Sequence, residues 1–159
     1  MTPGLDVAAA ELVAALKSRG ETLAAAESLT AGLVCATIAR IPGASAVLRG
    51  GFVVYATELK HDLAGVDARL LAEHGAVHPE VAAQLADGAR VRCGATWGLG
   101  LTGVAGPDPQ DGVPPGTVHL GLSGPSTRVV RTVTETGDRG MIRTASVAAA
   151  FSLLGEHLH

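Results

Sequence analysis

The alternation of helical and strand-like segments constrains this 159-residue chain more than any other feature. The early strand-like segments are separated by helical ones, which favours parallel pairing. The last two strand-like segments are joined by a short Ser-Gly-Pro-Ser connection, which favours an antiparallel hairpin. We therefore expect an α/β fold: a three-layer α/β/α sandwich with a mixed, mostly parallel sheet of about five strands.

The segments can be placed by residue number. Apolar residues three and four apart predict an amphipathic helix over 5–19, which Gly20 would end. Short apolar runs predict strands at 22–26, 52–55, 95–101, 117–122 and 127–134. Helical spacing predicts further helices at 28–41, 57–63, 67–73, 80–91 and 138–158. Ser28 or Thr30 would cap the first of these, Pro79 suits the start of the fourth, and Asp138 would cap the last.

Composition excludes several classes of protein. Hydrophobic residues make up 47% of the chain and the formal net charge is -3, which excludes intrinsic disorder and argues against a basic nucleic-acid-binding face. No apolar run reaches the length of a membrane span, and the first residues lack the pattern of a signal peptide. We expect one cytoplasmic domain over residues 1–159, with no nucleic-acid or membrane partner.

A literal GxGxxG pattern at residues 98–103 is the most tempting motif. A dinucleotide-binding fingerprint needs these glycines after a strand and at the opening of a helix, whose N-terminus meets the pyrophosphate. Here the first glycines fall inside a predicted strand, and the next residues, Ala-Gly-Pro-Asp-Pro, do not start a helix. We therefore reject a nicotinamide dinucleotide fold.

The six histidines and two cysteines do not predict a metal site. His74 and His78 are four residues apart, but Gly75 and Pro79 interrupt the helix that would align them. The two cysteines, Cys35 and Cys93, form neither a CxxC pair nor a disulfide framework. We expect no metal and no cofactor.

Three side chains have the chemistry of a nucleophilic site. Ser28 follows a predicted strand and opens a predicted helix, where helix N–H groups would activate its hydroxyl and stabilise an oxyanion. The structural alternative is that Ser28 only caps the helix. Tyr55 is the only tyrosine and ends a predicted strand, and Lys60 is one of two lysines. Taken alone, a single tyrosine at a strand end is usually an amphipathic plug, and a single lysine is usually solvated.

Several segments in a fixed order resemble the CinA C-terminal domain family over about residues 8–155. The characterised members of this family are nicotinamide-nucleotide amidohydrolases. The matching segments are Ala-Glu-Ser-Leu-Thr-Ala-Gly at 26–32, Pro-Gly-Ala-Ser at 42–45, Gly-Gly-Phe-Val-Val-Tyr-Ala-Thr-Glu-Leu-Lys at 50–60, Gly-Ala-Val at 75–77, Thr-Gly-Val-Ala-Gly-Pro at 102–107, Gly-Thr-Val at 116–118 and Gly-Asp-Arg at 137–139. Each piece is common, but their joint order is specific.

The resemblance implies hydrolysis of the carboxamide of nicotinamide mononucleotide to nicotinate mononucleotide and ammonia, as in pyridine nucleotide recycling, without metal or cofactor. It also implies a catalytic group made of Ser28, Tyr55 and Lys60. The N–H groups of Leu29 and Thr30 are candidates for the oxyanion site, and a Gly50-Gly51 turn with Arg139 and Arg143 for the phosphate. The expected substrate-binding residues are Leu29, Thr30, Gly32, Gly50, Gly51, Thr102, Gly103, Gly106, Arg139 and Arg143. We also expect a homo-oligomer.

This sequence departs from the usual family pattern at several positions. Leu29 and Ala31 stand where the family usually has Cys and Gly, and Ala56-Thr57 replaces Ser-Asn. The loop 107–116 lacks the lysine that commonly precedes its Pro-x-Gly-Thr. Two alternatives stay open: a non-catalytic member that binds a nucleotide or a partner protein, and a hydrolase of another small amide.

Overall fold

A computed structural model describes residues 3–158 of the chain, and its elements follow the predicted order closely. The strands are β1 (Leu23–Glu27), β2 (Leu48–Val53), β3 (Trp97–Gly103), β4 (Thr117–Gly124) and β5 (Thr127–Thr134). The helices are α1 (Pro3–Arg19), α2 (Leu33–Ala39), the 3₁₀ turn η1 (Ala44–Ala46), α3 (Thr57–Asp62), α4 (Ala68–His74), α5 (Pro79–Cys93) and α6 (Arg139–Glu156).

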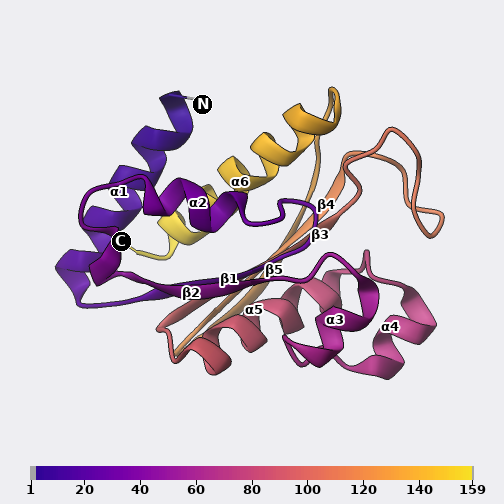
Figure 1. The fold of residues 1–159 in the computed structure, drawn as a ribbon, viewed down its shortest axis with the longest axis horizontal. Helices are drawn as coiled ribbons and strands as arrows, with labels where there is room; N and C mark the ends of the chain where they lie inside the picture. The colour runs from indigo at the N-terminus through magenta and orange to yellow at the C-terminus, as the bar shows by residue number, and fades with distance from the viewer. Residues whose placement is uncertain (1–2, 159) are drawn as a thin grey trace.

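The five strands form one mixed sheet in the order β2-β1-β3-β4-β5. β1 pairs in parallel with both β2 and β3, while β4 is antiparallel to β3 and to β5. Four strands therefore run in one direction and β4 alone runs in the other. The chain goes from β1 to one side of the sheet and then returns to the other side, so β2 and β3 flank the strand that came first (Figure 1).

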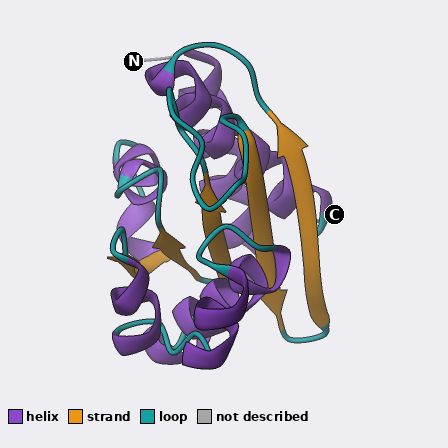
Figure 2. Ribbon diagram, turned by 90° about the vertical axis from the view of Figure 1, so that its right-hand side faces the viewer, coloured by secondary structure: helices purple, strands orange, loops and turns teal. Residues whose placement is uncertain are grey.

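Helices cover both faces of the sheet, as expected (Figure 2). α1, α2 and α6 lie on one face, and α5 lies on the other with α3 and α4 (Figure 1). The predicted apolar face of α1 is confirmed: its buried residues are Leu5, Ala9, Leu12, Val13 and Leu16. Two predicted helix starts are confirmed as well, since Pro79 begins α5 and the Asp138 carboxylate accepts the Met141 N–H in α6.

The glycines of the GxGxxG pattern serve packing. A Cβ atom on Gly98 would lie 2.1 Å from the Ala86 oxygen of α5. A Cβ atom on Gly100, or on Gly121 of β4, would lie 2.3 or 2.2 Å from the Ala82 oxygen of the same helix. Without these side chains, α5 packs directly on the backbone of β3 and β4. The close contact between helix and sheet therefore explains why Gly98 and Gly100 of this pattern are glycines.

Two local predictions are wrong. The helix expected from Ser28 begins at Leu33, with Gly32 as its N-cap, because residues 28–32 form a turn first. The glycines Gly50 and Gly51 do not form a turn; they lie inside β2, opposite Ala24 and Ala25 of β1. Space explains Gly51, since a Cβ atom there would lie 2.6 Å from the Ala25 carbonyl oxygen.

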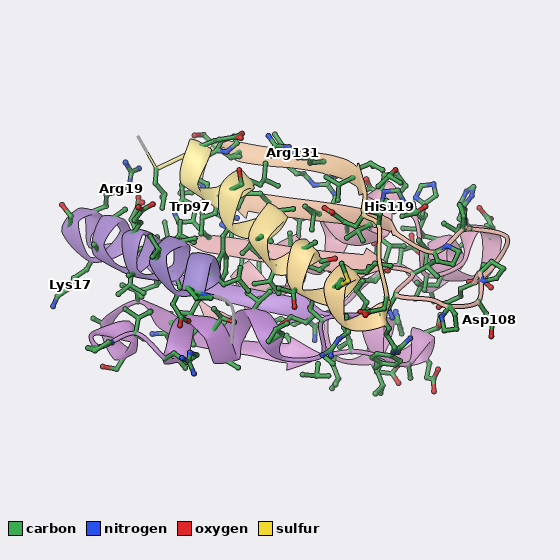
Figure 3. All side chains as sticks on the ribbon, turned by 90° about the horizontal axis from the view of Figure 1, so that it is seen from above. Lys17, Arg19, Trp97, Asp108, His119 and Arg131 are labelled. Carbon is green, nitrogen blue, oxygen red and sulfur yellow. The ribbon has the colours of Figure 1, made fainter. Side chains whose placement is uncertain are left out.

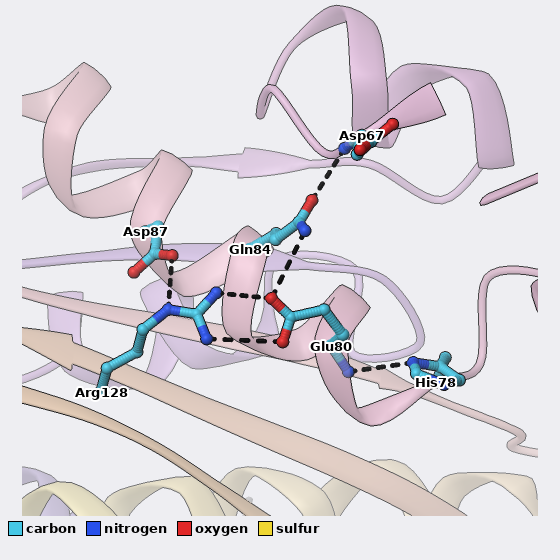
Figure 4. A network of polar contacts seen from close by, with 6 residues as sticks. All are labelled: Asp67, His78, Glu80, Gln84, Asp87 and Arg128. Atoms are coloured by element: carbon cyan, nitrogen blue, oxygen red, sulfur yellow. Dashed lines mark hydrogen bonds and ion pairs between the residues drawn. The ribbon is translucent and has the colours of Figure 1, made fainter. Parts of the chain in front are cut away.

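On the outer side of the molecule, an exposed polar network links β5 to α5 (Figure 4). Arg128 donates to both Glu80 and Asp87, at 2.7 and 2.9 Å, and Gln84 connects Glu80 to the backbone N–H of Asp67. Among residues 3–158, the helices are too short or too polar to span a bilayer.

Candidate active site

A cavity of about 390 Å³ opens where β1, β2 and β3 end. Its walls are Ser28 and Leu29 after β1, Tyr55 after β2, residues 103–110 after β3, and Arg139 at the start of α6. In open α/β sheets, ligands bind beyond the carboxyl ends of the strands, where the chain changes direction along the sheet. The cavity occupies that position, between β1 and β3.

Ser28 is held at the floor of this region by the backbone. Its N–H donates to the Leu101 carbonyl at 3.0 Å, and its carbonyl accepts the Ala31 N–H at 3.0 Å. The residue is 8% exposed and lines the cavity. Ala31 and Gly32 complete the turn with φ values of 48° and 97°, a region that favours glycine. The turn therefore carries strain at Ala31.

Glu27, next to Ser28 in the chain, has a structural role that the sequence analysis did not predict. Its carboxylate is 1% exposed and accepts the Thr30 hydroxyl at 2.7 Å and the N–H groups of Val34 and Cys35 at 2.8 and 3.2 Å. The buried Glu27 carboxylate thus caps the N-terminus of α2 from outside the helix. The signal was present, because Glu27 is the only charged residue between residues 22 and 39. This arrangement removes the predicted cap role of Ser28 and neutralises the helix terminus with Glu27 instead.

Tyr55 and Arg139 close one side of the cavity together. Arg139 Nη2 donates to the Tyr55 hydroxyl, and Arg139 Nη1 donates to the Gly106 carbonyl at 2.6 Å. Tyr55 is 52% exposed. The guanidinium therefore joins the end of β2 to the loop after β3. The contact with Tyr55 is exposed, and the contact with Gly106 is partly buried.

Lys60 lies beneath the cavity wall, in α3. It is 1% exposed, and its Nζ donates to the carbonyls of Val54 and Tyr55 at 2.8 and 3.2 Å. Burial lowers the pKa of Lys60 to about 8, with a smaller opposing effect from Glu58. A neutral amine has two N–H groups and one lone pair, so the two carbonyls occupy both of its donors. No hydrogen bond joins Lys60 to Ser28 in the described part of the chain.

The other predicted binding residues divide into two groups. Leu29, Gly103, Gly106 and Arg139 line the cavity. The remainder do not: Thr30, Gly32, Gly50, Gly51, Thr102 and Arg143.

Each residue of the second group has another contact or place. Thr30 donates to Glu27, Thr102 donates to the Ala76 carbonyl at 2.8 Å, and the two glycines of β2 lie within the sheet. Arg143 donates from Nε and Nη2 to the carbonyls of Leu29 and Thr30, both at 2.9 Å. The phosphate cradle expected from Gly50, Gly51 and Arg143 is therefore not assembled, and Arg139 is the guanidinium of the cavity.

Backbone donors are available in the cavity wall. Among the described residues, the N–H groups of Leu29, Ala105 and Gly106 find no protein acceptor. The Leu29 N–H matches one predicted oxyanion donor by residue, although no helix dipole reinforces it. Backbone N–H groups without a protein acceptor are suited to binding anionic oxygen atoms.

The loop 104–116 supplies a carboxylate that the sequence reasoning did not single out. Asp108 lines the cavity, whereas Asp111 does not and lies against Gly75. Figure 3 shows Asp108 at the end of the molecule opposite Lys17 and Arg19. A ligand in the cavity thus meets one positive and one negative side chain, Arg139 and Asp108.

The cysteines and histidines do not form an alternative centre. Burial, together with the neighbouring Glu27 carboxylate, raises the pKa of Cys35 to about 12, so this thiol is not a nucleophile at neutral pH. His74 and His78 stack with ring centroids 4.7 Å apart. Within residues 3–158, no group of three or more His, Cys, Asp or Glu side chains is placed to hold a metal ion.

The family model for the CinA C-terminal domain matches residues 5–158. The chain belongs to the CinA C-terminal domain family. A CinA-like protein of Frankia casuarinae is 52% identical over 139 residues, which is 87% of this chain and 32% of that protein. A CinA-like protein of Anaeromyxobacter sp. (strain K) is 47% identical over 146 residues, covering 90% of this chain and 35% of that protein. The chain therefore spans about a third of the length of these relatives.

Crystal structures of the CinA family have the same fold. The competence/damage inducible protein CihA of Agrobacterium tumefaciens superposes with a TM-score of 0.94 at 31% identity, covering 98% of this chain and 96% of that one. The competence damage-inducible protein A of Klebsiella pneumoniae gives a TM-score of 0.94 at 29% identity, covering 97% and 96%.

Proposed function

We propose that this chain hydrolyses the carboxamide of nicotinamide mononucleotide, with Ser28 as the nucleophile. The observation that carries the proposal is that Ser28, Tyr55 and Arg139 line one cavity beyond the carboxyl ends of the strands. Lys60 does not line the cavity, but its buried amine donates to the carbonyl of Tyr55, which does. Membership of the CinA C-terminal domain family supports the same reaction class.

The charges of the cavity suit this substrate. Nicotinamide mononucleotide carries an anionic phosphate and a cationic pyridinium ring. Arg139 provides a guanidinium for the phosphate, and Asp108 provides a carboxylate for the ring. The protein has a net charge of -3, so affinity for the phosphate must come from such local groups.

The proposed reaction has two steps, both balanced by Lys60. Ser28 Oγ attacks the carboxamide carbon, its proton passes to the neutral Lys60 amine, and that proton leaves with the amide nitrogen as ammonia. Water then attacks the acyl ester, Lys60 takes its proton, and the proton returns to Ser28 Oγ as nicotinate mononucleotide departs. Unpaired N–H groups of Leu29, Ala105 and Gly106 stabilise the oxyanion.

The direct test measures ammonia released from nicotinamide mononucleotide in the presence of a chelator. We expect turnover by the wild-type chain and a loss of at least about 10³-fold in Ser28→Ala, since removal of a nucleophile costs orders of magnitude. Ser28 does not cap α2, so the variant should keep its fold. Equal turnover in the two proteins would remove Ser28 from the role.

A second candidate is a non-catalytic member that binds the nucleotide. The strained Ala31 and the lack of a hydrogen bond between Lys60 and Ser28 among the described residues favour it. In that case calorimetry would show binding of nicotinamide mononucleotide by the wild-type chain, and no ammonia would form.

A further inference from the structure

The turn that carries Ser28 has one internal backbone hydrogen bond, from the Ala31 N–H to the Ser28 carbonyl, and one strained residue. Ala31 has a φ of 48° and Gly32 a φ of 97°, and alanine disfavours this region of backbone space. The turn also lies outside regular secondary structure, since β1 ends at Glu27 and α2 begins at Leu33. Contacts from outside residues 28–32 therefore help to keep the turn in place.

Besides the backbone bond from Ser28 to Leu101, two charged side chains make such contacts. Glu27 holds the C-terminal side of the turn by accepting the Thr30 hydroxyl and the first N–H groups of α2. Arg143 holds the carbonyl side: its Nε donates to the Leu29 oxygen and its Nη2 to the Thr30 oxygen, both at 2.9 Å. The planar guanidinium fork fixes two successive carbonyls at once.

Arg143 has no place in the cavity itself. Arg139, one helical turn earlier on α6, lines the cavity and contacts Tyr55 and Gly106. On the same helix, Arg139 therefore lines the cavity and Arg143 binds the backbone of the turn.

We propose that Arg143 is a positioning residue for Ser28, and that with Glu27 it clamps the strained turn in the conformation that presents the hydroxyl to the cavity. This inference rests on the proposed function of Ser28. Loosening the turn lowers the fraction of molecules with a correctly placed nucleophile, which lowers kcat. Substrate contacts made by Arg139 and the loop 104–116 persist, so KM changes little.

The test compares Arg143→Ala and Arg143→Lys with the wild-type chain. Arg131→Ala is the matched control, because Arg131 also reaches α6, through Glu156, but does not touch the turn. We expect Arg143→Ala to lower kcat for nicotinamide mononucleotide by about 10- to 100-fold, with KM within about twofold. Amide hydrogen exchange should accelerate at residues 28–33 in both Arg143 variants and stay unchanged in the control.

The strain at Ala31 gives an independent check. In an Ala31→Gly background, the turn adopts its positive φ without penalty, so Arg143→Ala should lower kcat less than it does beside Ala31. Equal losses in the two backgrounds would contradict a clamp that acts against strain.

Other outcomes separate this proposal from its rivals. A tenfold rise in KM, with loss of the preference for the nucleotide over plain nicotinamide, would show that Arg143 binds phosphate and overturn the proposal. Unchanged hydrogen exchange at residues 28–33 would overturn it too. If the wild-type chain releases no ammonia, the proposed function fails, and the exchange measurement alone decides whether Arg143 holds the turn.

Discussion

The turn at Ser28 and the outer surface between α5 and β5 both depend on charged side chains, but they use them differently. At the surface, Arg128 pairs with Glu80 and Asp87, and the three side chains are 47%, 40% and 38% exposed. At the turn, Glu27 is 1% exposed and its oxygens accept backbone N–H groups and a hydroxyl.

The two regions differ in whether water can replace a hydrogen-bond partner that is lost. Water takes over from either member of an exposed ion pair, so such pairs contribute little to stability. Buried N–H groups that lose their only acceptor gain nothing in exchange. The charges that matter most in this protein are therefore those that fix backbone next to the cavity.

Replacing a glutamate in each region gives the largest contrast. Glu27→Ala leaves two buried donors and one partly buried donor without an acceptor, and should lower the free energy of unfolding by about 3 kcal/mol. Glu80→Ala removes an exposed partner of Arg128 and should cost less than about 1 kcal/mol. Urea denaturation of both variants measures the difference, and equal losses would erase the distinction between the two regions.

The pH profile compares a buried cation with an exposed one. Ion pairing raises the pKa of Arg128, which stays charged, whereas burial lowers the pKa of Lys60 to about 8. If the neutral amine is the base, kcat/KM for nicotinamide mononucleotide rises about tenfold per pH unit below pH 8 and levels above it.

The same shift has a consequence for stability. The folded pKa of Lys60 lies below its ordinary value of 10.5, so between about 8 and 10.5 the unfolded chain binds a proton that the folded chain does not. Lys60 therefore makes stability rise with pH in this window. In Lys60→Met, the free energy of unfolding should lose this rise that the wild-type chain shows, and the activity should be lost as well. A kcat/KM that is flat from about pH 6.5 to 9 would exclude Lys60 as the base.

The smallest expected effect concerns the loop carboxylates. Asp108→Asn should raise KM for nicotinamide mononucleotide about threefold, because one exposed charge near a cationic ring contributes modestly. Asp111→Asn is the matched control outside the cavity and should leave KM unchanged. The reduced nucleotide, with its neutral ring, should inhibit wild-type and Asp108→Asn proteins equally. If KM changed more in Asp111→Asn than in Asp108→Asn, the ring site would lie near Asp111 and not near Asp108.

Most of the fold could be predicted from the sequence because its signals are local. The spacing of Leu5, Ala9 and Leu12 identifies the buried face of α1, and Pro79 and Asp138 mark helix starts by their own chemistry. The hairpin of β4 and β5 follows from a short connection between two strand-like runs.

The site was predicted only in part, because its geometry depends on contacts distant in sequence. Ser28 and Tyr55 line one cavity, but Arg143 reaches the turn from 114 residues away at Leu29, and local spacing does not reveal such a contact. Ser28 and Thr30 are good helix-capping residue types, so the sequence favours a helix start there. The buried Glu27 overrides that preference by capping α2 from the end of a strand.

Trapping of the acyl-enzyme tests the central claim most directly. Wild-type protein is mixed with nicotinamide mononucleotide, quenched in acid within the first turnovers, digested and analysed by mass spectrometry. We predict an acyl adduct of the nucleotide on the peptide that contains Ser28, absent from Ser28→Ala. An adduct on any other residue, or ammonia release that persists at the wild-type rate in Ser28→Ala, would contradict the assignment of this turn as the catalytic centre.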